Sequence, residues 1–230
     1  MLDRLLARIR KSTGQAVAYT LTPWDARAQS VRTGESALGD LIADIMLLSM
    51  EEVTRAHGTH GDREIDCCII CGGALRGDTV FGPGKITLGN VLEVLPFEDP
   101  VVLVELTGKD IWDALENGFS TYPRQEGRFP QVSGLSVVWD SSRPPGNRVI
   151  SVNMLENLTT DVACSQYEFH PGEGDTERVL VHRKEPRVRA PLALDKKYLV
   201  VTRHYLATGN DGYTALTRGK YMWVYANKYQ

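Results

Sequence analysis

The clearest pattern of apolar and polar positions lies in the first third of the chain and has the period of an α-helix. Apolar side chains recur at i, i+3, i+4, i+7 and i+8, which places them on one stripe of a helix. Gly58 follows as a typical helix end. We therefore expect a long helix that packs this stripe against a core. The stripe consists of Leu38, Leu41, Ile42, Ile45 and Met46.

Two shorter helices are predicted by their start signals. Thr87 can cap a helix that runs through Leu95 and stops before Pro96. Thr107–Asp110 fits a capping box, and the helix that it begins turns apolar side chains inward. These inward side chains are Ile111, Trp112, Leu115 and Phe119.

Strands are predicted mainly in the second half of the chain. An early exception is the apolar run that enters Gly72-Gly73, which indicates a strand followed by a tight glycine turn. The polar segment Glu168–Glu177 predicts a loop. The expected strands are Asp66–Ile70, Val101–Leu106, Leu135–Trp139, Val149–Leu155, Val179–His182 and Tyr198–Thr202, with Lys220–Ala226 as an added edge strand.

The order of these elements predicts the fold class. Helices come early and strands late, without regular βαβ alternation. We therefore expect a mixed α/β fold of the α+β type, with mixed, largely antiparallel sheets flanked by helices.

Composition narrows the classes of partner. The chain has 230 residues, enough to bury a core, and 26 Lys and Arg against 29 Asp and Glu give a net charge of −3. A mildly acidic chain without a basic block is a poor candidate for binding nucleic acid. No apolar run approaches the length of a membrane span, so no membrane partner is expected. Met1–Ile9 predicts a small amphipathic helix, without the apolar core of a signal peptide.

The cysteines predict free thiols. Cys67 and Cys68 are neighbours in an apolar run, and adjacent strand residues point to opposite faces, so they cannot easily pair. This usage fits a reducing compartment and favours the cytoplasm. Cys68-x2-Cys71 has no second ligand pair at zinc spacing, and His57–Asp62 is read as a polar loop. We therefore expect no metal site in this chain.

Three segments combine residues that suit a ligand. Cys71–Asp78 contains a glycine pair and an arginine, Val94–Asp99 holds Phe97 at an element boundary, and His204–Tyr213 packs Asn and Asp between glycines and aromatics. Each segment alone also fits a structural role, respectively a tight turn, a core anchor and a hairpin turn.

Taken together and in this order, these segments resemble the 5'-nucleotidase C-terminal domain family. The resemblance runs from about Val31 to Tyr213. Further matching motifs are Glu35–Asp44, Gly84–Thr87, Leu106–Asp110, Leu115-Glu116 and Phe129–Gly134.

The resemblance implies the domain plan and the partners. Residues 1–25 would form a linker helix and connector, residues 26–216 the nucleotide-binding domain, and residues 217–230 a tail. Family members are typically two-domain enzymes whose N-terminal metallophosphoesterase domain holds two divalent metal ions. The motifs of that domain are absent from this sequence. The expected role is therefore recognition of a nucleotide or nucleoside, with no catalytic residue and no cofactor in this chain.

The resemblance also implies the site residues. Phe97 and Tyr205 would stack on the two faces of a base, and Asp211 would bind the ribose hydroxyls. Arg32 and Arg76 would reach the ligand from the phosphate end. Two further residues are expected at the site, Gly73, whose missing side chain permits close approach, and Cys71, which stands where the family commonly has Asn.

Departures from the family pattern leave two alternatives open. Gly34 stands where many members have Arg, Tyr205 replaces a frequent Phe, and Asn210 replaces a frequent Gly. The chain could therefore be a stand-alone, non-catalytic binding module. Its ligand class could also differ, because relatives act on cyclic nucleotides, nucleotide sugars or inorganic sulfur esters.

Overall fold

The computed structural model describes residues 12–58, 63–156 and 188–225. The predicted helix over Met1–Ile9, the loop over Glu168–Glu177 and the strand over Val179–His182 lie outside these residues, as does most of the loop that follows His57.

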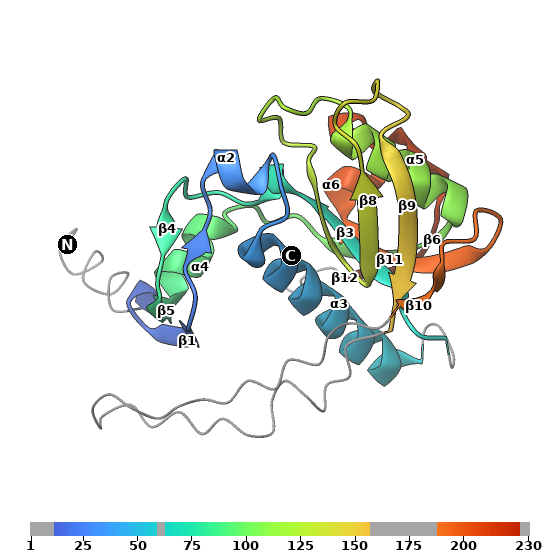
Figure 1. Cartoon of the computed structure of the whole chain (residues 1–230). Helices are drawn as coiled ribbons and strands as arrows, with labels where there is room; N and C mark the ends of the chain where they lie inside the picture. Colours follow the sequence, from blue (N-terminus) through green and yellow to red (C-terminus); the bar gives the residue numbers. More distant parts are fainter. Residues whose placement is uncertain (1–11, 59–62, 157–187, 226–230) are drawn as a thin grey trace.

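A five-stranded sheet forms the centre of the larger part of the molecule (Figure 1). Its strand order is β12-β6-β11-β3-β7. β3 and β11 run parallel and the other neighbours are antiparallel, so the predicted mixed, largely antiparallel architecture is confirmed. The strands span Lys220–Tyr225 (β12), Val101–Thr107 (β6), Lys197–Arg203 (β11), Cys67–Cys71 (β3) and Pro130–Ser133 (β7).

A separate hydrophobic core lies on each face of this sheet. Helix α3 (Ala37–His57) covers one face. Leu38, Ile42 and Met46 of its predicted stripe pack into the core on this face, which also contains Leu103 of β6 and Leu199 and Val201 of β11. The prediction was wrong for Ile45, which is 48% exposed, because the buried side of the helix continues through Ala43, Leu47 and Met50 instead.

Helix α5 (Gly108–Phe119) and a second sheet cover the other face. Cys67 belongs to the core under α5 and Cys68 to the core under α3, as expected for neighbours on a strand. The second sheet has the order β10-β9-β8, formed by Val188–Pro191, Val149–Leu155 and Leu135–Trp139.

The helix ends follow the predicted signals. Thr87 and Thr107 each accept a backbone N–H and complete a capping box, at the start of α4 (Leu88–Val94) and α5 respectively. Gly58 ends α3 in the left-handed region at φ 63°. The tail strand β12 pairs with β6 at the sheet edge, as predicted.

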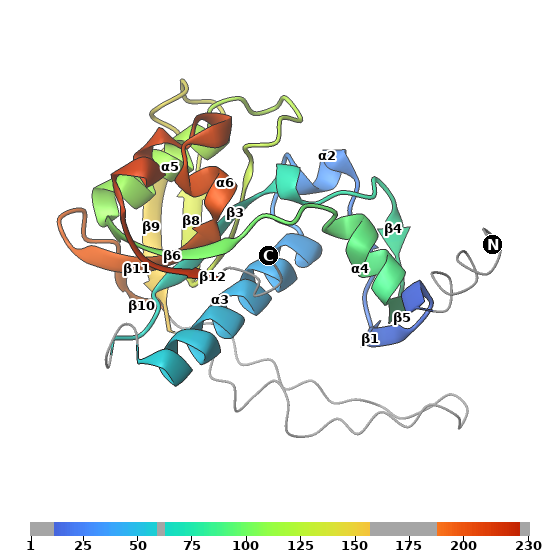
Figure 2. The ribbon, with the colours of Figure 1, turned by 180° about the vertical axis from the view of Figure 1, so that it is seen from behind.

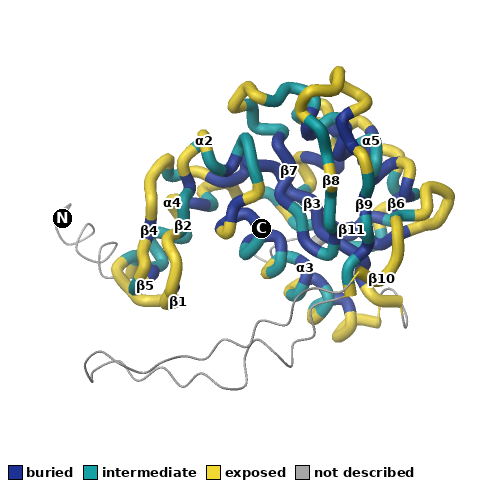
Figure 3. The backbone as a smooth tube through the Cα atoms, in the orientation of Figure 1, coloured by how far each residue is buried: buried dark blue, intermediate teal, exposed yellow. Residues whose placement is uncertain are grey.

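A smaller lobe lies beside the main sheet (Figure 2). It consists of α4 and two antiparallel strand pairs, β1 (Ala16–Thr20) with β5 (Gly84–Thr87) and β2 (Trp24–Asp25) with β4 (Val80–Phe81). β1 and β2 fall in the segment predicted as a connector, where the sequence pattern predicted no strands. Figure 3 shows that this lobe is largely exposed, so the sequence carries only a weak apolar pattern there.

The direction of the strands gathers four chain segments at one end of the sheet. β3 and β11 are parallel and finish there, while β6 and β7 are antiparallel to them and begin there. Val101 at the start of β6 pairs with Arg203 at the end of β11, and Cys71 at the end of β3 pairs with Pro130. Residues just outside these strand ends therefore meet in space.

A buried glutamine ties the turn before α3 to this end of the sheet. Gln131 on β7 donates from its side-chain amide to the carbonyls of Val31 and Gly34, at 3.0 and 2.8 Å. Its side-chain oxygen accepts from the Ser36 N–H at 3.2 Å. Helix α2 (Ala28–Val31), which precedes this turn, is thereby held against the glycine turn after β3.

Gly72 is required by close backbone approach. A Cβ on Gly72 would lie 1.9 Å from the Val31 carbonyl oxygen, so α2 and the turn after β3 would have to separate. We expect Gly72→Ala to cost about 1–3 kcal/mol, the range for overpacked sites. That cost lowers the melting temperature by roughly 2–4 °C per kcal/mol in a domain of this size.

Gly34→Ala is the matched control for this prediction. A Cβ on Gly34 meets no atom within 4 Å. Thermal unfolding followed by circular dichroism should separate the two variants, and equal melting temperatures would contradict the packing argument.

Candidate functional site

A cleft of about 740 Å³ opens at the end of the sheet where the four strand ends meet. Its walls come from the turn before α3, the turn after β3, the loop before β6, the loop before β7 and the segment after β11. The lining residues are Arg32, Cys71, Gly73, Ala74, Arg76, Pro96, Phe97, Glu98, Asp99, Gly127, Arg203, Tyr205 and Asp211.

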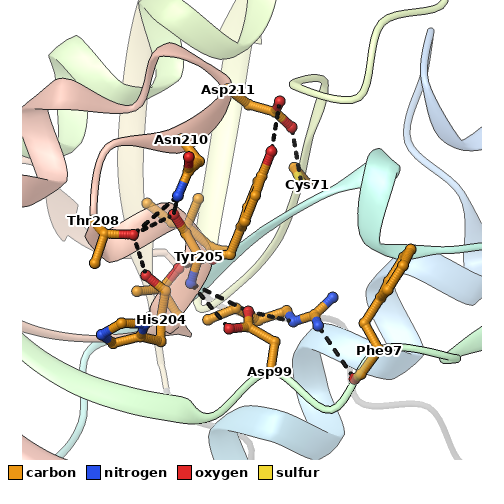
Figure 4. Close-up of polar contacts among 11 residues, drawn as sticks. Cys71, Phe97, Asp99, His204, Tyr205, Thr208, Asn210 and Asp211 are labelled. Carbon is orange, nitrogen blue, oxygen red and sulfur yellow. Dashed lines mark hydrogen bonds and ion pairs between the residues drawn. The ribbon is translucent and has the colours of Figure 1, made fainter.

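Two exposed aromatic rings face this cleft. Phe97 is 50% exposed and Tyr205 is 44% exposed, although large apolar rings are usually buried. Phe97 precedes β6, and Tyr205 lies on the short helix α6 (His204–Ala207) that follows β11. The antiparallel pairing of β6 with β11 brings them together, and Figure 4 shows the two rings standing apart with space between them.

An ion pair joins the two segments that carry the rings. Arg203 Nε lies 3.0 Å from Asp99 Oδ2, with both side chains largely buried. The Asp99 carboxylate also accepts from the Tyr205 backbone N–H, with both of its oxygens 3.2 Å from the nitrogen. Arg203 in turn donates to the Phe97 carbonyl at 3.4 Å. Because a largely buried ion pair with several hydrogen bonds has fixed geometry, the positions of the two rings are coupled.

Two further arginines bring positive charge to the cleft. The Arg76 guanidinium carbon lies 5.0 Å from the centre of the Phe97 ring, within cation–π range. Arg32 donates to the Gln125 carbonyl at 3.3 Å, and its Nε is buried without a hydrogen-bond partner. Within the described residues neither arginine forms an ion pair. Their charge is available to an anionic ligand.

Asp211 lies in the helical turn that follows α6 and presents its carboxylate to the cleft. Its backbone is in the left-handed region at φ 52°, and its carbonyl accepts from Asn117 at 3.1 Å. The Tyr205 hydroxyl donates to Oδ1 at 3.2 Å, and Cys71 Sγ lies 3.9 Å from Oδ2 (Figure 4).

The floor of the cleft is formed where two glycines touch. The Gly73 N–H donates to the Gly127 carbonyl at 2.8 Å. A Cβ on Gly73 would lie 2.8 Å from the Gly127 Cα, so the contact excludes side chains on both segments.

The Cys71 thiol and the Tyr205 hydroxyl, which face the Asp211 carboxylate, are kept protonated by burial and by the charge of that carboxylate. Burial raises the pKa of the Cys71 thiol to about 11, and the Asp211 charge adds to this effect. Burial and then the same charge raise the pKa of the Tyr205 hydroxyl. Both groups therefore face Asp211 as neutral donors at physiological pH.

All the residues predicted from the sequence for a ligand site line this one cleft. They are Arg32, Cys71, Gly73, Arg76, Phe97, Tyr205 and Asp211. Two of the structural alternatives do not hold. Phe97 is half-exposed and is not a core anchor, and the segment after β11 forms short helical turns instead of a hairpin.

The sequence reasoning missed Asp99 and Arg203. Asp99 lies two residues after Phe97, and Arg203 lies two residues before Tyr205. Arg203 also ends a buried strand, and a charged residue at that position beside a predicted site was a usable signal. Their pairing depends on the register of β6 with β11, which the sequence pattern does not specify.

Within residues 12–58, 63–156 and 188–225, no group of three His, Cys, Asp or Glu side chains could hold a metal ion. In that same part of the chain, no helix combines the length and apolarity that a membrane span needs.

Comparison with known proteins decides the family. A family model described as "5'-nucleotidase, C-terminal domain" matches residues 13–218. The chain belongs to the 5'-nucleotidase C-terminal domain family. The match begins just ahead of β1 and ends before β12, so it includes the smaller lobe and the main sheet apart from this edge strand.

Individual relatives agree with this assignment. The chain is similar to a trifunctional nucleotide phosphoesterase protein of Bacillus subtilis, with 30% identity over 96% of this chain and 12% of the relative. It is also similar to the 5'-nucleotidase of Bos taurus, with 32% identity over 92% of this chain. The crystal structure of a 5'-nucleotidase precursor from Thermus thermophilus superposes with a TM-score of 0.71 at 32% identity, over 95% of this chain and 36% of that one.

This chain therefore corresponds to a part of its relatives. It spans 12% and 32% of the length of the two curated proteins named above. The matched part is the C-terminal domain of 5'-nucleotidases, and the motifs of a metallophosphoesterase domain are absent from the sequence.

The protonated thiol of Cys71 gives a testable consequence. Because its pKa is about 11, its alkylation rate should still rise by roughly tenfold per pH unit between pH 7 and pH 10, without a plateau. Mass spectrometry of iodoacetamide-treated protein measures this rate in a Cys164→Ser background, since Cys164 lies outside the described residues.

Asp211→Asn tests the cause of the raised pKa. Removing the negative charge next to Sγ should increase the alkylation rate of Cys71 at every pH below 10, while burial keeps the pKa above its ordinary value. A wild-type alkylation rate that levels off below pH 9 would contradict the raised pKa of Cys71. An equal rate in the Asp211→Asn variant would contradict the contribution of the Asp211 charge.

Proposed function

We propose that this domain recognises nucleotides or nucleosides for a 5'-nucleotidase-like phosphate-ester hydrolase. The observation that supports this proposal most is the placement of two half-exposed rings in one cleft. Phe97 and Tyr205 both line the cleft, and their rings stand apart with space between them. A flat, uncharged base fits between such rings, because stacking on both faces requires no particular hydrogen-bond pattern.

The charges around the rings suit the remainder of a nucleotide. Asp211 is an acceptor beside Tyr205, where a pentose attached to a stacked base would carry its hydroxyl donors. Arg32 and Arg76 lie in the same cleft without ion-pair partners among the described residues, and their guanidinium groups suit phosphate. The relatives are named for nucleotide substrates, which supports the same ligand class.

The residues of this chain bind and orient, and the hydrolytic chemistry is assigned to a second domain. We infer a metallophosphoesterase domain with two divalent metal ions as the partner in the full-length protein, in keeping with relatives that are about three times as long. A reading frame upstream of Met1 that encodes the metal-ligand motifs would support this arrangement. A complete, independently expressed gene without them would favour the stand-alone binding module instead.

Nucleoside binding tests the recognition role directly. Titration calorimetry with adenosine and adenosine 5'-monophosphate should give dissociation constants in the micromolar-to-millimolar range for the isolated chain. Phe97→Ala should weaken binding by about 5- to 150-fold, because stacking contributes about 1–3 kcal/mol per base. At millimolar affinity this loss abolishes detectable binding.

Tyr19→Ala is the matched control for the loss of the ring. Tyr19 is 56% exposed, carries a similar ring and does not line the cleft. Its removal should leave the dissociation constants unchanged. A folded wild-type chain that binds neither compound would overturn the proposed function, and equal affinities of the Phe97→Ala variant and the wild type would overturn the assignment of the base site.

A further inference from the structure

Both oxygens of the Asp211 carboxylate face donors supplied by the chain itself. The Tyr205 hydroxyl donates to Oδ1 at 3.2 Å, and the Cys71 thiol faces Oδ2 at 3.9 Å. The two contacts differ in strength, because a hydroxyl is a full donor and a thiol is a weak one. The Tyr205 hydroxyl therefore uses one acceptor position of Oδ1, and Oδ2 is only weakly engaged.

The contact between Tyr205 and Asp211 joins two well-fixed backbone segments. The Tyr205 N–H is held by the Asp99 carboxylate, which is itself paired with Arg203. On the other side, the left-handed backbone of Asp211 is fixed by the hydrogen bond from Asn117 to its carbonyl. Neither partner has to move for the hydroxyl to stay on Oδ1, so the contact belongs to the resting geometry of the cleft.

The neighbours of the carboxylate leave one side of it open. Gly127 lies beside Oδ2, and a Cβ there would be 3.1 Å from that oxygen. The absence of a side chain at Gly127 keeps a path to Oδ2, and both residues line the cleft. A ligand can therefore approach Oδ2 by displacing only the weak thiol contact.

A pentose with two neighbouring hydroxyls binds a carboxylate best when each hydroxyl donates to its own oxygen. In this cleft Oδ1 already accepts a hydrogen bond from the Tyr205 hydroxyl, so a sugar hydroxyl would have to compete with it there. We propose that the Tyr205 hydroxyl is a specificity-determining group that restricts Asp211 to a single sugar hydroxyl, so that the site accepts ribose and 2'-deoxyribose with similar affinity. This inference rests on the proposed function.

The ratio of the affinities for adenosine and 2'-deoxyadenosine reports how many sugar hydroxyls bind Asp211. In the wild-type chain, adenosine and 2'-deoxyadenosine should bind within about threefold of each other, because only one hydroxyl gains a bond to the charged carboxylate. Tyr205→Phe keeps the ring for stacking and frees Oδ1. The variant should therefore prefer adenosine by about tenfold or more, as expected for one added hydrogen bond to a charged group.

The experiment titrates adenosine and 2'-deoxyadenosine into the full chain as wild type, Tyr205→Phe and Tyr221→Phe, using calorimetry. Tyr221→Phe is the control, since it removes a hydroxyl from a tyrosine that is 41% exposed and does not line the cleft. Its affinity ratio should equal that of the wild type. Thermal unfolding of each variant verifies that the comparison is made between folded proteins.

The outcomes separate this inference from the proposed function. A ratio that rises only in Tyr205→Phe supports the inference. If the wild type binds nucleosides but already prefers adenosine by tenfold, or if Tyr205→Phe loses affinity for both compounds equally, the hydroxyl does not restrict the sugar and the inference is overturned while the proposed function stands. A folded wild type that binds neither compound overturns both.

Discussion

The antiparallel pairing of β6 with β11 is the constraint on which the site depends. Its register, from Lys197 opposite Thr107 to Arg203 opposite Val101, brings the start of one strand next to the end of the other. The loop before β6 and the helix after β11 must then lie side by side, and the Asp99–Arg203 ion pair locks them together. A shift of one residue would turn the core side chains of β11 to the wrong face, so packing on both faces of the sheet fixes the position of the rings.

Much of the fold was predictable because its signals are local. The stripe of α3, the capping boxes before α4 and α5, and the continuous apolar runs of β6 and β11 each depend on neighbouring residues. The strands of the smaller lobe were missed because they are two to five residues long and mostly half-buried or exposed, so they show little alternation of apolar and polar positions. The parallel pairing of β3 with β11 was also beyond the sequence, since an apolar run such as Cys67–Cys71 carries no information on strand direction.

The candidate site was likewise predictable only in part. Its members could be found by their motifs, which mark ring, glycine and carboxylate positions along the chain. The contacts between these residues could not be predicted, because the bond from the Tyr205 hydroxyl to Asp211 depends on a left-handed backbone at Asp211 and on a half-buried partner, Asn117, that holds this backbone. Arg203 likewise gains its role only through its partner across the sheet. Residue types are local properties, whereas hydrogen-bond partners are a property of the folded chain.

The walls of the cleft span the chain from Arg32 to Asp211, and no compact stretch of the sequence contains more than a portion of them. Gln131 adds to this by tying the segment of Arg32 to a strand about a hundred residues away. The cleft is therefore formed only when the whole domain is folded. By linkage, a ligand that binds only this folded form would add RT ln(1 + [L]/Kd) to the stability of the whole domain, including the distant strand β12 and helix α5. Protection of amide hydrogens from exchange would then increase throughout the sheet on ligand binding, well beyond the residues that touch the ligand.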